Sequence, residues 1–261
     1  MLHRQEPQGL ICISQPNHAW VSGQLARSWG NEVFGTFSPW EAVCLGAEQH
    51  DIGWLPWERS PTLNRKTGRP HSFQEVATAV HVNLWSGAKH LALPFGRYVA
   101  LLVSLHGSGL YQRYRGWQHS PESTRLVEEF LRQETAFQEE VTATLQQDSY
   151  YATYVTPVEL ERNRQLIAIW DALSLAVCQG LRSQQPLNQV PTAAGETTLT
   201  LTPVAQDPLQ VTVAPWPFQT HEVTLICEGQ LLRQTATDEA ALQAALECAP
   251  WVTLRTILRP A

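Results

Sequence analysis

The sequence has no apolar run long enough to cross a membrane. A spanning helix needs about 18 or more consecutive apolar residues, and no stretch of the 261 residues approaches that length. The apolar run from Leu10 to Ser14 is also too short for the hydrophobic part of a secretory signal. These absences predict a cytoplasmic protein with no membrane partner.

Lysine is almost missing, and positive charge is not in excess. Lys66 and Lys89 are the only lysines among 18 basic residues, which stand against 24 acidic residues and leave a formal net charge of -6. Such a chain has no broad positive field for a nucleic-acid duplex. Arginine favours planar, two-pronged contacts with carboxylate or phosphate. We therefore expect a small, anionic substrate as the partner and leave a homodimer open.

The cysteines lack the pattern of a disulfide framework or a zinc ribbon. There are five, an odd number, none forms a C-x-x-C pair, and each lies in an apolar stretch. This pattern predicts buried, reduced thiols. The chain also has no internal repeat and no low-complexity tract, which excludes a solenoid.

The composition is that of a folded protein, with 43% hydrophobic and 16% charged residues. The character of the sequence changes near residue 190, where helical periodicity gives way to alternating, Pro- and Thr-rich sequence. We predict a helical domain over residues 1–190 and a β-rich C-terminal subdomain over residues 191–261.

Three segments before that boundary have the form of a capping box, in which the first residue and a glutamate satisfy free amides of a helix N-terminus. They begin at Ser38, Ser72 and Thr156. The helices that we expect span residues 16–30, 38–50, 72–90, 95–107, 120–148 and 157–184, with a long loop over 55–71. The expected strands span residues 197–204, 209–213, 222–227 and 251–258, with a helix at 238–248 and a strand at 10–14 that pairs with this tail. The predicted fold class is mainly α, a helical bundle followed by a small α+β subdomain.

Histidine and aspartate recur along this helical part with one group on each of several expected helices. The set comprises His18, the adjacent His50 and Asp51, His81, His106 and Asp171. Asp171 is unusual because it lies mid-helix between two apolar runs, where an ionised carboxylate costs several kcal/mol unless it is paired or bound to a metal. Imidazole and carboxylate together suit Fe, Mn, Ni or Zn. The pattern predicts a divalent transition metal, one or two ions per chain.

The order His…His-Asp…His…His…Asp resembles the HD-domain superfamily of metal-dependent phosphohydrolases, in the expanded form of the dinuclear HD-GYP phosphodiesterases and the mixed-valent diiron HD oxygenases. With Pro215-Trp216-Pro217-Phe218 in the β-rich tail, the chain also resembles an uncharacterised bacterial domain-of-unknown-function family of HD type. The resemblance covers residues 10–185 and implies an HD-like bundle.

By this resemblance, one metal is held by His18, His50, Asp51 and Asp171, and His50 and Asp51 form the catalytic pair. His81 and His106, with Asp51 bridging, would hold a second metal.

Two motifs of that superfamily are missing. Where HD-GYP proteins and several oxygenases read HD-x-G-Lys, Ile52-Gly53 is followed by Trp54. The segment from His106 to Tyr111 matches the GYP motif only faintly, so a cyclic dinucleotide is not expected as the substrate. The residues expected to contact the substrate are Trp54 in an aromatic wall, Arg59, Lys66 and Arg69 on the long loop, and Arg113.

The resemblance implies a metal-dependent phosphohydrolase or phosphodiesterase that acts on a small phosphorylated metabolite or nucleotide. Two alternatives stay open at this point. One is a diiron oxygenase of HD type, and the other is a non-catalytic, metal-binding regulatory module that acts through its β-rich tail.

Overall fold

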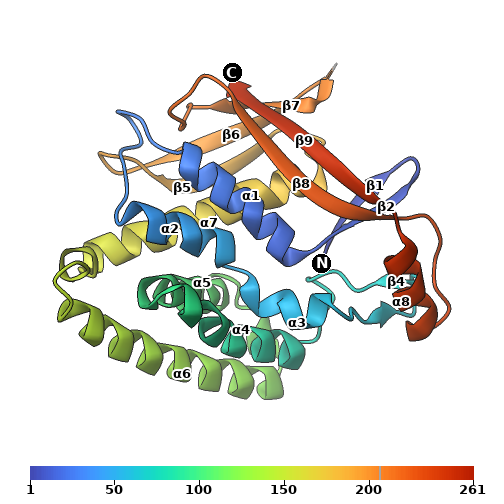
Figure 1. Ribbon diagram of the computed structural model, residues 1–261, viewed down its shortest axis with the longest axis horizontal. Coiled ribbons are helices and arrows are strands. Elements are labelled where there is room, and N and C mark those ends of the chain that lie inside the picture. Colours follow the sequence, from blue (N-terminus) through green and yellow to red (C-terminus); the bar gives the residue numbers. More distant parts are fainter. Residues whose placement is uncertain (206) are drawn as a thin grey trace.

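A mixed β-sheet covers one side of the molecule, and the helices lie beneath it in layers (Figure 1). The computed structural model describes residues 1–205 and 207–261. The strands are β1 (Leu2–Glu6), β2 (Gly9–Ile13), β3 (Leu63–Asn64), β4 (Arg69–Pro70), β5 (Gln185–Pro191), β6 (Glu196–Val204), β7 (Asp207–Ala214), β8 (Val223–Leu232) and β9 (Trp251–Pro260). In the described residues, β3 and β4 form a small hairpin, and the other seven strands form one sheet in the order β1-β2-β8-β9-β7-β6-β5.

The predicted fold class, mainly α, is wrong, because the chain folds as α+β. The N-terminal hairpin β1–β2 and five C-terminal strands form one sheet. This sheet is a full layer of the fold. The expected pairing of the N-terminal strand with the tail is confirmed, since Leu10 of β2 lies opposite Leu232 of β8. All neighbouring strands run antiparallel except β7 and β9, which are parallel.

The helices lie close to their predicted positions. The α-helices are α1 (Gln15–Ser28), α2 (Trp40–Gln49), α3 (Leu55–Glu58), α4 (Thr78–Ala92), α5 (Arg97–Arg113), α6 (Pro121–Gln146), α7 (Pro157–Gln179) and α8 (Glu239–Cys248). Short 3-10 turns are η1 (Ile52–Trp54), η2 (Leu93–Phe95), η3 (Gly116–His119) and η4 (Ala152–Tyr154). None of the helices in the described ranges is long and apolar enough to cross a bilayer.

The three predicted helix starts differ in outcome. Thr156 caps α7 as predicted, because its hydroxyl accepts a hydrogen bond from the Glu159 amide at 3.3 Å. At Ser72 the predicted box forms only a turn: the Glu75 carboxylate accepts from the Ser72 amide at 2.8 Å, but α4 begins at Thr78. The helix predicted from residue 38 begins at Trp40 without a side-chain cap.

The helices α1 and α7 lie between the sheet and the remaining helices (Figure 1). Three buried rings mark the centre of this interface: Trp29, directly after α1, lies with its ring centroid 5.9 Å from that of Trp170 and 5.6 Å from that of Phe218. The neighbour of Trp170, Asp171, contacts His18 of α1 and His106 of α5. One hydrophobic cluster contains residues from both sides of position 190, such as Leu2 and Leu258. The predicted division of the chain into two domains at residue 190 stays a prediction.

Candidate metal centre

Four helical segments bring their polar side chains to one point below α1 and α7. His18 lies in α1, His50 caps the C-terminus of α2 with Asp51 directly after it, His106 lies in α5, and Asp171 lies in the middle of α7. His18, His50 and His106 are buried, and the Asp171 side chain is 14% exposed.

Glycine is needed where the chain leaves this cluster. A Cβ atom on Gly53 would lie 2.5 Å from the Leu84 carbonyl oxygen and 2.8 Å from the Ala88 side chain. Only glycine therefore allows η1 to pass so close to α4. This close approach fixes the direction of the chain directly after His50 and Asp51.

The ligand atoms of the cluster are spaced like the donors around one ion. The Nε2 atom of His18 lies 3.2 Å from Asp51 Oδ2, 3.2 Å from Asp171 Oδ1 and 3.3 Å from His50 Nε2. His50 Nε2 lies 3.4 Å from Asp51 Oδ2 and 3.6 Å from Asp171 Oδ1. Metal–ligand bonds of about 2.0–2.2 Å place neighbouring ligands of a tetrahedral ion about 3.3–3.6 Å apart. The distances from both imidazoles to both carboxylates therefore suit ligands of a shared transition-metal ion.

Hydrogen bonds behind the histidines direct the same nitrogen atom of each ring into the cluster. The Nδ1–H of His50 donates to the Ala47 carbonyl at 2.8 Å. The Ser174 hydroxyl donates to the Asp171 carbonyl at 2.8 Å, so its oxygen is free to accept from Nδ1–H of His18 at 2.6 Å. Both Nε2 atoms thus turn a lone pair toward the two carboxylates, as metal-binding histidines with fixed outer partners do.

The two carboxylates of the cluster favour a positive charge beside them. Burial opposes protonation of His50, but the charge of Asp51 and hydrogen bonds with Asp171 and Asp51 raise its pKa to about 10. Burial also opposes protonation of His18, and hydrogen bonds with Asp171 and Asp51 raise its pKa above the ordinary value. Although burial opposes their ionisation, contacts with these imidazoles lower the pKa of Asp51 and of Asp171. In the metal-free protein, protons on the two imidazoles balance the charges of the two carboxylates, and a divalent cation would displace these protons.

His106 lies beside this set of four ligands. Its Nε2 atom is 3.7 Å from Oδ2 of Asp171, whereas His18 contacts the other oxygen, Oδ1. Burial and the neighbouring His50 lower the pKa of His106 to about 4, so its ring is neutral at pH 7. Within the described residues, two overlapping sets have ligand atoms close enough to hold an ion: His18 with His50 and Asp51, and His50 with His106 and Asp171. They share His50, so His106 extends the cluster on the Asp171 side.

The structure does not bring His81 to the cluster. Its Nδ1 atom lies 2.5 Å from the Tyr111 hydroxyl oxygen, and its Nε2 atom accepts from the Trp85 indole N–H at 3.3 Å. Both ring nitrogens are therefore occupied by other side chains. The second ligand set implied by the resemblance, with His81 as a member, is not assembled in this structure.

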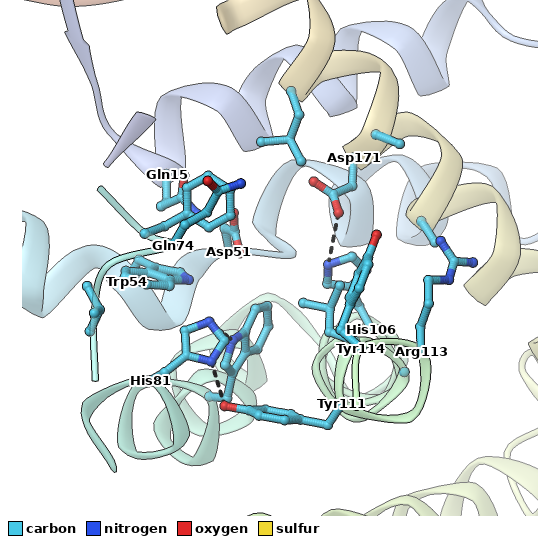
Figure 2. A pocket seen from close by; sticks show the side chains of 18 of the residues that line it. Gln15, Asp51, Trp54, Gln74, His81, His106, Tyr111, Arg113, Tyr114 and Asp171 are labelled. Carbon is cyan, nitrogen blue, oxygen red and sulfur yellow. Dashed lines mark hydrogen bonds and ion pairs between the residues drawn. The ribbon is translucent and has the colours of Figure 1, made fainter. Parts of the chain in front are cut away.

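The cluster forms part of the wall of a cavity of about 540 Å³ (Figure 2). The volume is in the range of small-molecule sites. His18, Asp51, His106 and Asp171 line it, and so does the buried Trp54. Further lining residues that the sequence did not single out are Gln15, Phe73, Gln74, Tyr114 and Arg164. An ion at the cluster would thus be open to a substrate in the cavity.

The basic residues expected to contact the substrate divide into two groups. Arg113 lines the cavity, whereas Arg59, Lys66 and Arg69 are not among its lining residues. The predicted loop begins as α3, and Arg59 directly follows this helix. Lys66 and Arg69 belong to the β3–β4 hairpin, which is held on α8 through the Leu63 amide and the Glu239 carboxylate at 2.9 Å. Sequence reasoning had no means of foreseeing this contact between segments so far apart.

Comparison with known proteins identifies the family but no function. The curated proteins and the solved structures gave no match. One family model, described as "Protein of unknown function (DUF3891)", matches residues 1–234. Because this match covers most of the sequence, including every residue of the candidate metal centre, the chain belongs to the DUF3891 family.

Proposed function

We propose that this protein is a metal-dependent phosphohydrolase or phosphodiesterase of HD type that acts on a small phosphorylated metabolite or nucleotide. One divalent transition-metal ion would be held by His18, His50, Asp51 and Asp171. The observation that carries the proposal is that the Nε2 atoms of His18 and His50 each lie 3.2–3.6 Å from an oxygen of both carboxylates at a cavity wall. Their chain order, His…His-Asp…Asp, resembles that of HD enzymes.

A divalent cation supplies Lewis acidity, and it lowers the pKa of a water molecule that it binds toward about 7. The two carboxylates balance its charge, so the metal centre is close to neutral once the histidines have lost their extra protons. A neutral centre does not repel an anionic substrate, and the neutral ring of His106 adds no charge.

The positive charge for a phosphoryl group would come from arginine. Arg113 lines the cavity, is exposed, and forms no ion pair within residues 1–205 and 207–261. Arg164 lines the same cavity, but a two-pronged contact with Glu161 at 2.9 and 2.6 Å holds its guanidinium. We therefore assign Arg113 as the main contact to the phosphoryl oxygens, which a guanidinium binds through paired N–H groups.

The experiment is reconstitution of chelator-treated protein with Mn, Fe, Ni or Zn in turn, followed by elemental analysis and hydrolysis assays. The probes are 4-nitrophenyl phosphate, a monoester, and bis(4-nitrophenyl) phosphate, a diester. We expect one ion per chain and metal-dependent hydrolysis of at least one probe. Asp171→Asn should lose activity by at least the about 10- to 100-fold typical of losing an outer partner of a metal ligand, since it removes the charge of a ligand carboxylate. Asp148→Asn changes an aspartate that pairs with Arg97 away from the cavity and serves as the matched control.

Two results would contradict this proposal. Stoichiometric metal without hydrolysis of either ester would favour a binding or regulatory module. Two irons per chain with turnover that consumes dioxygen would favour the oxygenase.

A further inference from the structure

The cavity contains a second group of side chains that the metal centre does not use. Trp54, His81, Trp85 and Tyr111 all line the cavity, and we call them the aromatic recess. The ring centroid of His81 lies 5.3 Å from that of Trp54, 6.2 Å from that of Trp85 and 5.5 Å from that of Tyr111. Figure 2 shows His81 and Tyr111 joined on one side of the cavity, with Asp171 and Arg113 on the other.

The hydrogen bonds within the recess run in one direction. The indole N–H of Trp85 can only donate, so Nε2 of His81 is an acceptor in the 3.3 Å contact between them. The neutral ring then carries its hydrogen on Nδ1, and Nδ1–H donates to the Tyr111 oxygen at 2.5 Å. Since Tyr111 is the acceptor here, its own hydroxyl hydrogen is left to donate elsewhere.

The protonation states of His81 and Tyr111 agree with this direction of hydrogen-bond donation. Burial lowers the pKa of His81 to about 4, against a weaker opposing effect of Asp51, and burial raises the pKa of Tyr111 well above its ordinary value. Both groups are therefore neutral at pH 7. Among the described residues, the Tyr111 hydroxyl contacts no polar partner other than His81.

Two more cavity residues carry buried polar atoms that the chain leaves unused. Trp54 Nε1 and Gln15 Oε1 have no hydrogen-bond partner in the described part of the chain, although Trp54 is 1% and Gln15 is 3% exposed. A buried polar atom without a partner is costly and calls for an explanation such as a ligand or an ordered water. These residues, like Tyr111, indicate a ligand with polar atoms on an otherwise apolar body.

We propose that Trp85, His81 and Tyr111 form a one-way hydrogen-bond chain that offers the Tyr111 hydroxyl hydrogen to the organic part of the substrate. The aromatic recess takes a planar ring that carries an acceptor, a carbonyl oxygen or a ring nitrogen, while the metal and Arg113 hold the phosphoryl end. Tyr111 is then a specificity-determining residue. The phosphoryl end of this assignment rests on the proposed function, and the recess does not.

The test is binding of non-hydrolysable probes to the metal-loaded protein by titration calorimetry. Methylphosphonate has no ring, phenylphosphonate has a ring without an acceptor, and the 3- and 4-carbamoyl derivatives of phenylphosphonate add a carbonyl. We expect phenylphosphonate to bind more tightly than methylphosphonate, and one carbamoyl derivative more tightly again. Tyr111→Phe should lower the affinity for that derivative by about 3- to 10-fold, the value of one hydrogen bond, and leave the other two probes unchanged.

Two further variants sharpen the test. Trp85→Phe removes the N–H that fixes the His81 tautomer and should weaken the same carbamoyl probe. Tyr150→Phe changes a tyrosine that is 61% exposed and is not among the residues lining the cavity, and it should change nothing. Thermal unfolding and metal content verify that each variant is folded and loaded, and Trp85→Phe carries the test if Tyr111→Phe does not fold.

The proposal is overturned if phenylphosphonate binds no better than methylphosphonate, or if Tyr111→Phe weakens all probes equally. If no phosphonate binds, the proposed function fails at its phosphoryl end, and benzamide then tests the recess alone. Binding of benzamide that Tyr111→Phe weakens would support the recess, and no binding would overturn it.

Discussion

The Nε2 atoms of His18 and His50 lie 3.3 Å apart, and each ring uses its Nδ1 atom for a hydrogen bond to an oxygen of the chain. Two imidazoles in this arrangement need a positive charge between them and the carboxylates of Asp51 and Asp171. A proton or a metal ion can supply it, and this competition leads to the first prediction.

Metal affinity should rise with pH. The pKa of His50 in the metal-free protein is about 10 against an ordinary value of 6.5, so at neutral pH the ion must displace a proton. The affinity should therefore increase by about tenfold per pH unit for each proton displaced, from about pH 6.5 toward pH 10. Titration of the chelator-treated protein with Zn or Mn at several pH values measures this slope, and a flat profile would contradict it.

Stability of the metal-free protein should follow the opposite trend. Because the folded pKa of His50 is raised, its contribution is complete below about pH 6.5 and is lost as the pH rises through about 10. The pKa values of Asp51 and Asp171 are lowered below 3.8, so their contribution is present above about pH 4 and is lost in acid. Thermal unfolding after chelation should show the highest midpoint between these limits. Asp51→Asn should flatten the decline on the alkaline side.

Ser174→Ala should weaken metal binding without removing a ligand. The hydroxyl lost in this variant accepts from His18 Nδ1 at 2.6 Å and fixes which nitrogen faces the ion. Loss of such an outer partner typically costs about 10- to 100-fold in metal affinity. Ser86→Ala is the control, because within the described residues the Ser86 hydroxyl bonds to the Val82 carbonyl alone, one turn earlier in α4. Equal affinities in the two variants would show that His18 does not depend on Ser174.

His81→Gln should retain the full metal content, whereas His50→Gln should lose it. The two nitrogens of His81 are bound to Tyr111 and Trp85, while Nε2 of His50 faces both carboxylates. Elemental analysis of the two purified variants decides this. A loss of one of two ions in His81→Gln would instead support the dinuclear site that the HD resemblance implies.

Glu134→Gln should destabilise the protein strongly. Glu134 of α6 is 1% exposed, pairs with Lys89 of α4, and accepts from the Ser104 hydroxyl of α5 at 2.6 Å. Removal of one charge from a buried pair leaves the other unpaired and costs about 3–5 kcal/mol in the free energy of unfolding. Urea denaturation measures the change.

The double variant Lys89→Met/Glu134→Leu should recover much of that loss, because no buried charge remains. Arg132→Ala, on the same helix, breaks an exposed pair with Glu129 and should leave the unfolding curve unchanged. A single variant with wild-type stability would show that the pair contributes nothing.

The helices could be predicted because their signals are local. Apolar spacing and the Thr156 cap mark α7 without reference to the rest of the chain. The sheet could not be predicted in full, because its order depends on contacts between the two ends of the chain. The β1 segment has only five residues, and β5 contains two prolines and a bulge between Leu187 and Val190, so neither has a clear alternating pattern.

The sequence by itself determined the residues of the candidate metal centre that are chemically conspicuous. Asp171 in an apolar helix and the adjacent His50 and Asp51 stand out because a buried charge needs a partner. Only the tertiary structure decided the surroundings of His81 and the position of the loop that carries Arg59. The residue type says what a side chain can bind, but the rotation of each helix and the packing of distant segments decide which partner it meets.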